Sequence, residues 1–244
     1  MASEYDRITA YHYSAYRPGL HRLILNRCIP KNTKLDWGLD IGCGTGQSAI
    51  ALAEYCQKVI ATDPSAAMLE KSITHAKVTY HLGNGESLDF PAHHFDIVTF
   101  AGSLYYAKSQ KLLDEVIKVS NHGAKIIVYD FEILLDAIRS KLDLERDEKE
   151  EIHYNHQENF SGLKNQALAY IDNASEEIAL DIPPSNLAHL LLSEKNSYDC
   201  LSSRLGNDTL YDKLKNQLVV LSGGEEYKVK ANLFYSIYEC DSND

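Results

Sequence analysis

The sequence contains no apolar run that approaches the roughly 18–20 residues needed by a membrane-spanning helix. Its first residues, MASEYDRITAYHYSAYRP, are polar and aromatic and lack the apolar core of a secretory signal. The five cysteines are scattered, with no C-x-x-C pair and no spacing typical of metal ligands. These absences predict a cytoplasmic protein with free thiols, no bound metal and no membrane partner.

Positive charge is also scarce. Lys and Arg number 24 against 35 Asp and Glu, which gives a formal net charge of -11. A field of that sign repels phosphate backbones, so the charge favours a small-molecule substrate over a nucleic-acid partner. The chain of 244 residues, 44% of them hydrophobic, suits a single compact α/β domain spanning residues 1–244. Nothing in the composition indicates an oligomeric state.

Short apolar runs alternate with amphipathic segments in the first half of the chain. Strands are expected at 39–41, 58–62, 78–82, 95–100 and 125–131, and helices at 47–55, 65–74 and 110–120. Gly123 is expected to end the last of these helices in a left-handed cap. Such alternation is typical of parallel β-α-β units with helices on both faces of the sheet.

The rhythm changes after Glu132. A charged helix is expected over 133–152, a sixth strand over 178–182, helices that end near Leu192 and Leu221, and a last strand over 227–239. The acidic run at 143–151 is interpreted as a solvated helix face. The expected fold is therefore a Rossmann-like, doubly wound, mostly parallel seven-stranded sheet. A helical cap over 134–170 follows the fifth strand, and residues 1–30 form a helical N-terminal lid.

The stretch LDIGCGTG carries three alternating glycines, Gly42, Gly44 and Gly46, between a strand and a helix. Glycines allow positive φ and a close approach of the backbone to a ligand at a helix N-terminus. Dinucleotide loops usually read G-x-G-x-x-G, whereas here the third glycine comes one residue earlier. Asp40 would repel a pyrophosphate but attract an amino group or a sulfonium ion. The alternative role of Asp40 is to cap the glycine turn.

A second acidic residue, Asp63, closes the second strand, at the distance where a carboxylate accepts ribose hydroxyls. Met68 follows where it could pack on an adenine face. Asp63 could instead cap the following helix. Cys43, inside the loop, is interpreted as a small filler, because a reactive thiol there would need a lowered pKa. The pair His93-His94 is interpreted as a surface turn without further metal ligands.

These motifs resemble those of the class I S-adenosylmethionine-dependent methyltransferases. The resemblance continues through NGESLDFPAHHFDIVTF and implies the cofactor and a set of residues that bind it, namely Asp40, Gly42, Cys43, Gly44, Gly46, Asp63, Pro64, Met68, Asn84, Gly85, Glu86, Ala101 and Ser103. It covers residues 36–131 most closely.

More narrowly, Tyr13-Ser14-Ala15-Tyr16-Arg17-Pro18 resembles the start of the type-11-like group that includes trans-aconitate methyltransferases. Leu20-His21 replaces the tyrosine-proline pair of that group. Tyr105 and Tyr106 follow the fourth strand, where the resemblance implies that the substrate pocket opens; the alternative is that they pack under the cap. Tyr13 and Arg17 could fold over the cofactor as part of a lid, with Arg17 paired to a carboxylate of the cofactor or substrate; the alternative is a surface helix whose aromatic residues lie in the core. The expected cap adds aromatic or titratable residues near the mouth of the site, namely His153, Tyr154, His156 and Phe160.

The predicted function is in-line transfer of a methyl group from S-adenosylmethionine to a small acceptor, with a carboxylate or a hydroxyl favoured. A carboxylate is already ionised at pH 7 and needs no base. A hydroxyl would need a His or Tyr near the mouth. No catalytic residue is assigned from the sequence. The alternatives are a nicotinamide-dependent oxidoreductase of the same topology and a cofactor-binding module without activity.

Overall fold

The structure is a computed structural model that describes residues 8, 11–12, 15–85, 87–144, 154–164 and 166–241. Tyr13, Glu86 and most of the acidic run 143–151 are not among these residues. The predictions on them therefore lie outside the described residues. The part of the helix expected over 133–152 that falls at 145–152, and the role of His153, lie outside them too. No helix of the described residues is long and apolar enough to cross a membrane.

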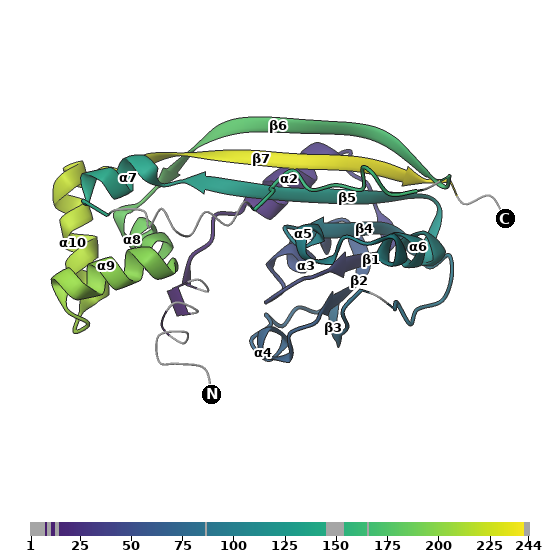
Figure 1. The fold of residues 1–244 in the computed structure, drawn as a ribbon, viewed down its shortest axis with the longest axis horizontal. Coiled ribbons are helices and arrows are strands. Elements are labelled where there is room, and N and C mark those ends of the chain that lie inside the picture. Colours follow the sequence, from purple (N-terminus) through teal and green to yellow (C-terminus); the bar gives the residue numbers. More distant parts are fainter. Residues whose placement is uncertain are drawn as a thin grey trace. The chain divides into compact units, whose positions relative to one another are not determined.

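The described strands form one seven-stranded sheet in the order β3-β2-β1-β4-β5-β7-β6. Strands β1 (Leu35–Ile41), β2 (Cys56–Asp63), β3 (Val78–Leu82), β4 (Phe95–Ala101) and β5 (Ser120–Leu134) are paired in parallel. Strands β6 (Leu168–Ile182) and β7 (Tyr227–Cys240) complete the sheet, and Figure 1 draws β7 antiparallel to β5. The expected Rossmann-like, mostly parallel sheet is confirmed.

The chain divides into two compact units. One unit comprises residues 1–18, 132–153 and 177–232, and the other comprises 19–131, 154–176 and 233–244. We call the second of these the core unit, because it contains the glycine loop. The long strands β5, β6 and β7 contribute residues to both units. Each unit is described by itself below.

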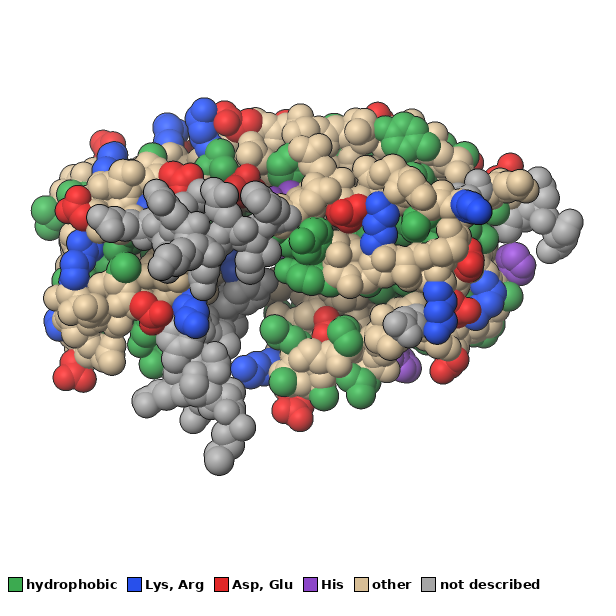
Figure 2. Space-filling view, viewed as in Figure 1, with side chains coloured by type: hydrophobic (Ala, Val, Ile, Leu, Met, Phe, Trp, Pro, Cys, Tyr) green, Lys and Arg blue, Asp and Glu red, His purple; other side chains and the backbone are tan. Residues whose placement is uncertain are grey.

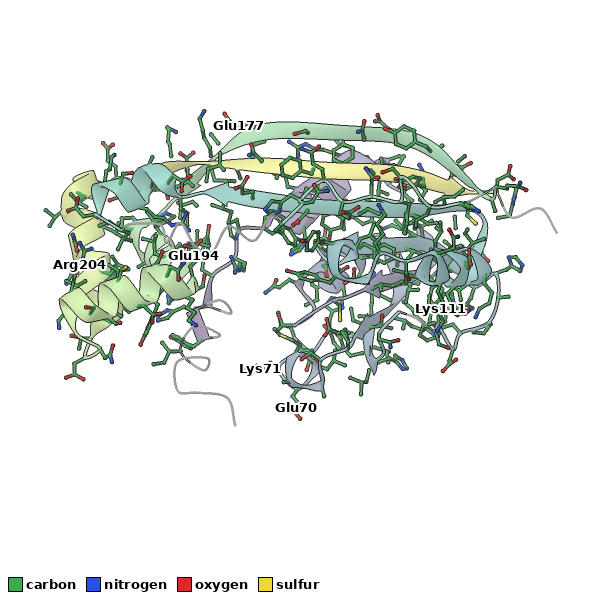
Figure 3. The ribbon with its side chains drawn as sticks, viewed as in Figure 1. Glu70, Lys71, Lys111, Glu177, Glu194 and Arg204 are labelled. Atoms are coloured by element: carbon green, nitrogen blue, oxygen red, sulfur yellow. The ribbon has the colours of Figure 1, made fainter. Side chains whose placement is uncertain are left out.

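The core unit holds α2 (Leu20–Cys28), which precedes β1, and the helices that connect the parallel strands (Figure 1). The connecting helices are α3 (Gln47–Leu52), α4 (Ala66–Leu69), α5 (Leu104–Ala107) and α6 (Gln110–Val119). In α6, Leu112, Leu113, Val116 and Val119 recur at helical spacing and are buried against Phe95 and Phe100. Burial of each such side chain stabilises the fold by roughly 1.5–3 kcal/mol. Exposed Glu70 and Lys71 follow α4 (Figure 3).

The other unit holds α7 (Asp136–Lys141), α8 (Pro184–Leu192), α9 (Lys195–Leu205) and α10 (Leu210–Ser222). Their leucines share a separate core with Val229 of β7. Arg139 of α7 forms an ion pair with Glu194, the N-cap residue of α9, and Arg204 donates to the Leu142 carbonyl (Figure 3). These two contacts hold the C-terminal end of α7 against α9.

Two local expectations are wrong. Gly123 does not end α6, because the helix closes at Val119, where Ser120 Oγ donates to the Val116 carbonyl and Ser120 already pairs with Phe95. Gly123 lies inside β5, at φ 74°, where the register between β4 and β5 shifts.

The start of the sixth strand is the second, whereas the helical cap over 134–170 stays a prediction. Between 134 and 170 the described residues contain one helix, α7, and residues 154–164 form turns and irregular backbone. Strand β6 begins at Leu168 rather than at 178. It lies at the edge of the sheet, where one side of the strand faces solvent and acidic and amide side chains are tolerated. Its sequence therefore lacks the apolar run that identifies a buried strand.

Candidate functional site

The glycine loop connects the end of β1 to α3. The amides of Gly42 and Cys43 both donate to the Thr62 carbonyl, at 2.7 and 3.0 Å, which ties the loop to the end of β2. Gly42, Gly44 and Gly46 have φ of 75°, 54° and 95°, in the left-handed region that favours glycine. A Cβ on Gly42 would lie 2.3 Å from the Ser103 Cβ, so β1 and the turn after β4 approach closely here.

Asp63 shapes the loop from the end of β2. Its Oδ2 accepts from the Gly44 amide and its Oδ1 from the Ser65 amide, both at 2.8 Å. A carboxylate offers about four lone-pair positions, so each oxygen keeps the capacity for one more hydrogen bond. Asp63 is 7% exposed and lines the largest cavity described below. Asp63 does not cap the following helix, because the N-cap residue of α4 is Ser65; ligand binding by Asp63 stays a prediction.

Asp40 lies behind the loop rather than in the cavity. Its side chain is completely buried and accepts hydrogen bonds from Ser48 Oγ at 2.5 Å and Thr99 Oγ1 at 2.7 Å. Burial raises the pKa of Asp40 to about 6, with the Asp63 charge adding to the rise and the two hydroxyl donors opposing it. Its direct contacts join α3 and β4 beneath the glycines, so its charge reaches a ligand only through space.

A cavity of about 650 Å³ opens at the carboxyl ends of β1, β2 and β4. Seven of the predicted site residues line it, namely Gly42, Asp63, Pro64, Asn84, Ala101, Ser103 and Tyr106. Gly102, between the predicted Ala101 and Ser103, lines it too. Sequence reasoning missed the other lining residues, which are Ile41, Gly83, Ala107, Lys108 and Ser109. Ligand pockets in proteins typically measure about 300–1,000 Å³. This is also the edge of an open α/β sheet where ligands bind.

The other predicted residues lie around this cavity or apart from it. Gly44 and Gly46 complete the loop, and Gly85 is buried against Leu112 and Ile41. Met68 of α4 is 47% exposed and does not line the cavity. Arg17 is half-buried in the other compact unit, and Tyr105 lines a narrow gap beside Gly102.

Cys43 is buried, and burial together with the carboxylates of Asp40 and Asp63 raises the pKa of its thiol far above the usual range. The thiol stays protonated, which agrees with a filler role. The described residues contain no group of three or more side chains that could hold a metal ion. On the face drawn in Figure 2, positive and negative side chains are interspersed.

Comparison with known proteins gives the family. Residues 39–123, which contain the glycine loop, Asp63 and most of the cavity lining, match the family described as "Methyltransferase domain". This segment therefore matches a methyltransferase domain. The chain is also 32% identical over 142 residues to the ubiquinone/menaquinone biosynthesis C-methyltransferase UbiE of Zymomonas mobilis, covering 54% of this chain and 56% of UbiE.

A provisionally named methyltransferase of Dictyostelium discoideum is 27% identical over 119 residues, which cover 49% of this chain and 44% of that protein. The chain thus spans about half the length of these curated relatives. A solved structure, of a provisionally named type II methyltransferase of Anaeromyxobacter dehalogenans, superposes with a TM-score of 0.61 at 20% identity. The superposition covers 93% of this chain and 98% of that one, and it shows that the two structures share a fold.

Proposed function

We propose that this chain transfers the methyl group of S-adenosylmethionine to a small-molecule acceptor by in-line displacement. The observation that carries the proposal is the cavity at the strand ends, bordered by a tight glycine loop and by a carboxylate with spare acceptor capacity. The family match of residues 39–123 supports the same reading.

The residues present fit this cofactor. No atom lies within 4 Å of the position that a Cβ on Gly44 would take, so the loop offers bare backbone to a ligand. The two Asp63 oxygens would hold the ribose hydroxyls, and Asn84 and Pro64 would border the adenine. Ala101 and Ser103, at the end of β4, would face the sulfur. When bound, the cofactor supplies a methyl group that is already electrophilic.

The protein's own contribution is then positioning. The Ser103 hydroxyl donates to the Ile41 carbonyl, which locks the turn after β4 against the glycine loop. A fixed wall of this kind holds an acceptor atom and the methyl carbon at near-attack distance, which can supply much of the rate. UbiE is named as a C-methyltransferase. Because the similarity covers 56% of UbiE, we do not assign a carbon acceptor to this chain.

Isothermal titration calorimetry with S-adenosylhomocysteine tests the proposal, with NADH as the comparison ligand. Saturable binding of S-adenosylhomocysteine and none of NADH is expected. The opposite result would favour a nicotinamide-dependent oxidoreductase. Cofactor binding without release of S-adenosylhomocysteine across an acceptor panel of phenols, carboxylates and amines would favour the binding module without activity.

A further inference from the structure

The loop after β3 holds the only Asn-Gly pair of the sequence, Asn84-Gly85. In such a pair the backbone nitrogen of the glycine can attack the side-chain carbonyl carbon of the asparagine, because glycine has no Cβ to hinder the approach. Both residues belong to the core unit, and Asn84 lines the large cavity. The pair therefore combines a reactive sequence with a place in the proposed cofactor site.

Asn84 lies beyond the point where the sheet holds the backbone. The ladder between β2 and β3 ends at the pair of Asp63 and Leu82, and the Gly83 amide adds a bond to the Asp63 carbonyl at 3.1 Å. Asn84 and Gly85 follow this ladder in irregular backbone, and Asn84 is exposed. A loop peptide outside a ladder can rotate toward its own side chain, and exposure gives water access to the product.

The fold itself requires glycine at position 85. Gly85 has φ 75°, in the left-handed region that side chains disfavour. A Cβ at this position would also lie 3.1 Å from Leu112 Cδ1 and 3.5 Å from Ile41 Cγ2, in the core beneath the loop. Both constraints disfavour the larger residues that would slow the attack on Asn84. The reactive pair is therefore a consequence of how this loop packs.

A carboxyl group in place of the Asn84 amide would change the cavity. The amide can both donate and accept hydrogen bonds, whereas a carboxylate only accepts them. Adenine presents acceptor ring nitrogens beside a donor amino group, so the amide suits it better. The new charge would also share the cavity with the Asp63 carboxylate, which repels it. An isoaspartate would in addition lengthen the backbone by one carbon just before Gly85.

We propose that Asn84-Gly85 is a self-modification site, and that its conversion lowers the affinity of the cavity for its cofactor as the protein ages. The Gly85 nitrogen forms a bond to Asn84 Cγ, the Cγ–Nδ2 bond breaks, and ammonia leaves with the Gly85 amide proton. Water then opens the cyclic imide at either carbonyl and gives aspartate or isoaspartate. The effect on affinity rests on the proposed function, whereas the conversion itself does not.

Peptide mapping by mass spectrometry tests the conversion on the full chain during incubation in warm, mildly alkaline buffer. Asn207 is the internal control, because it is also exposed in a turn but is followed by Asp208. Asn84 should convert roughly 10-fold faster than Asn207 or more, since only Asn207 is followed by a residue with a Cβ. Equal rates at the two positions, or an Asn84 that stays intact, would overturn the inference.

Isothermal titration calorimetry with S-adenosylhomocysteine tests the effect on the cavity. The converted protein should bind roughly 10-fold more weakly than fresh protein, as expected for the loss of one hydrogen bond. Asn84→Asp should weaken binding by a similar factor without incubation. In the matched variant Asn84→Gln the extra methylene group slows cyclisation, so its affinity should not change during incubation. Unchanged affinity of both the converted protein and Asn84→Asp would overturn the inference.

Bound ligand gives a further readout. Saturating S-adenosylhomocysteine should cover Asn84 and slow its conversion, while the conversion of Asn207 stays the same. Equal conversion of Asn84 with and without saturating ligand would overturn the link between this pair and the cavity. If S-adenosylhomocysteine fails to bind to fresh protein, the proposed methyl transfer falls instead, and the mass measurement still decides whether the pair converts.

Discussion

The glycine loop allows a sharp test, because two of its glycines have the same backbone requirement but different surroundings. Gly42 and Gly44 both have positive φ. A Cβ on Gly42 would lie 2.3 Å from the Ser103 Cβ and 2.9 Å from its Oγ, whereas a Cβ on Gly44 would meet no atom within 4 Å. We therefore compare Gly42→Ala with Gly44→Ala.

The expected magnitudes follow from two separate costs. Holding alanine in the left-handed region costs roughly 1–2 kcal/mol at either position. At Gly42 the collision with Ser103 adds the cost of overpacking, roughly 1–3 kcal/mol. Gly42→Ala should therefore lower the free energy of unfolding by about 2–5 kcal/mol, and Gly44→Ala by about 1–2 kcal/mol.

Ligand binding should rank the two variants differently. The open space beside Gly44 is where the proposed cofactor approaches the backbone, so Gly44→Ala should weaken S-adenosylhomocysteine binding more than its small effect on stability suggests. Urea denaturation measures the stability of each variant, and calorimetry measures its affinity. The double variant Gly42→Ala/Ser103→Gly should recover part of the overpacking cost and so identifies the collision.

The reasoning would be refuted if Gly44→Ala destabilised the protein as much as Gly42→Ala. It would also be refuted if Gly44→Ala bound S-adenosylhomocysteine with unchanged affinity. The first result would mean that β1 and the turn after β4 do not approach closely. The second would mean that the ligand does not lie against this loop.

Three further perturbations act on charge. Asp63→Ala should weaken S-adenosylhomocysteine binding by about 1–3 kcal/mol through lost charge-assisted hydrogen bonds, and unchanged affinity in calorimetry would contradict the site. The pKa of Asp40 is raised from 3.8 to about 6, so its stabilising effect is complete below pH 3.8 and is lost as pH rises through 6. Asp40→Asn should therefore increase stability at pH 8 by up to roughly 3 kcal/mol in urea denaturation. Burial lowers the pKa of His12 from 6.5 to about 4, and the charge of His189, whose Nδ1 lies 2.9 Å from His12 Nδ1, adds to the decrease. Stability that is present above pH 6.5 is then lost as pH falls toward 4, and His12→Gln should reduce this acid sensitivity in thermal denaturation, with burial of His189 retaining part of it.

Most of the parallel part of the fold was predictable because its inner strands are buried on both faces, whereas the edge strand β3 has no buried residue. Phe95, Ile97 and Val98 are completely buried in β4, so the sequence needs an apolar run at this place. The glycine loop was predictable for a related reason, since positive φ at alternate positions excludes most side chains. Both features constrain residue type locally, and a local constraint is visible in a single sequence.

The remaining features depend on contacts between distant segments. Strand β6 is partly exposed along its length and carries Asp172, Glu176 and Glu177, so neither composition nor periodicity distinguishes it from a loop. Ser120 ends α6 with a side-chain hydrogen bond, a cue as strong as the glycine three residues later. The pairing of His156 with Asp130 joins residues 26 positions apart through an irregular segment, and no spacing rule predicts it.

The division between predictable and unpredictable residues has a chemical consequence. The glycine loop, Asp63 and Ser103 lie inside the family match of residues 39–123, whereas Asp130, Tyr154 and His156 lie outside it. In the proposed function, methyl transfer uses the first group whatever the acceptor is, but the need for a base depends on the acidity of the acceptor. Replacement of residues 154–160 by the corresponding segment of a relative should therefore change which acceptors react and leave S-adenosylhomocysteine affinity nearly unchanged. A parallel loss of cofactor affinity would show that this segment supports the cofactor site itself.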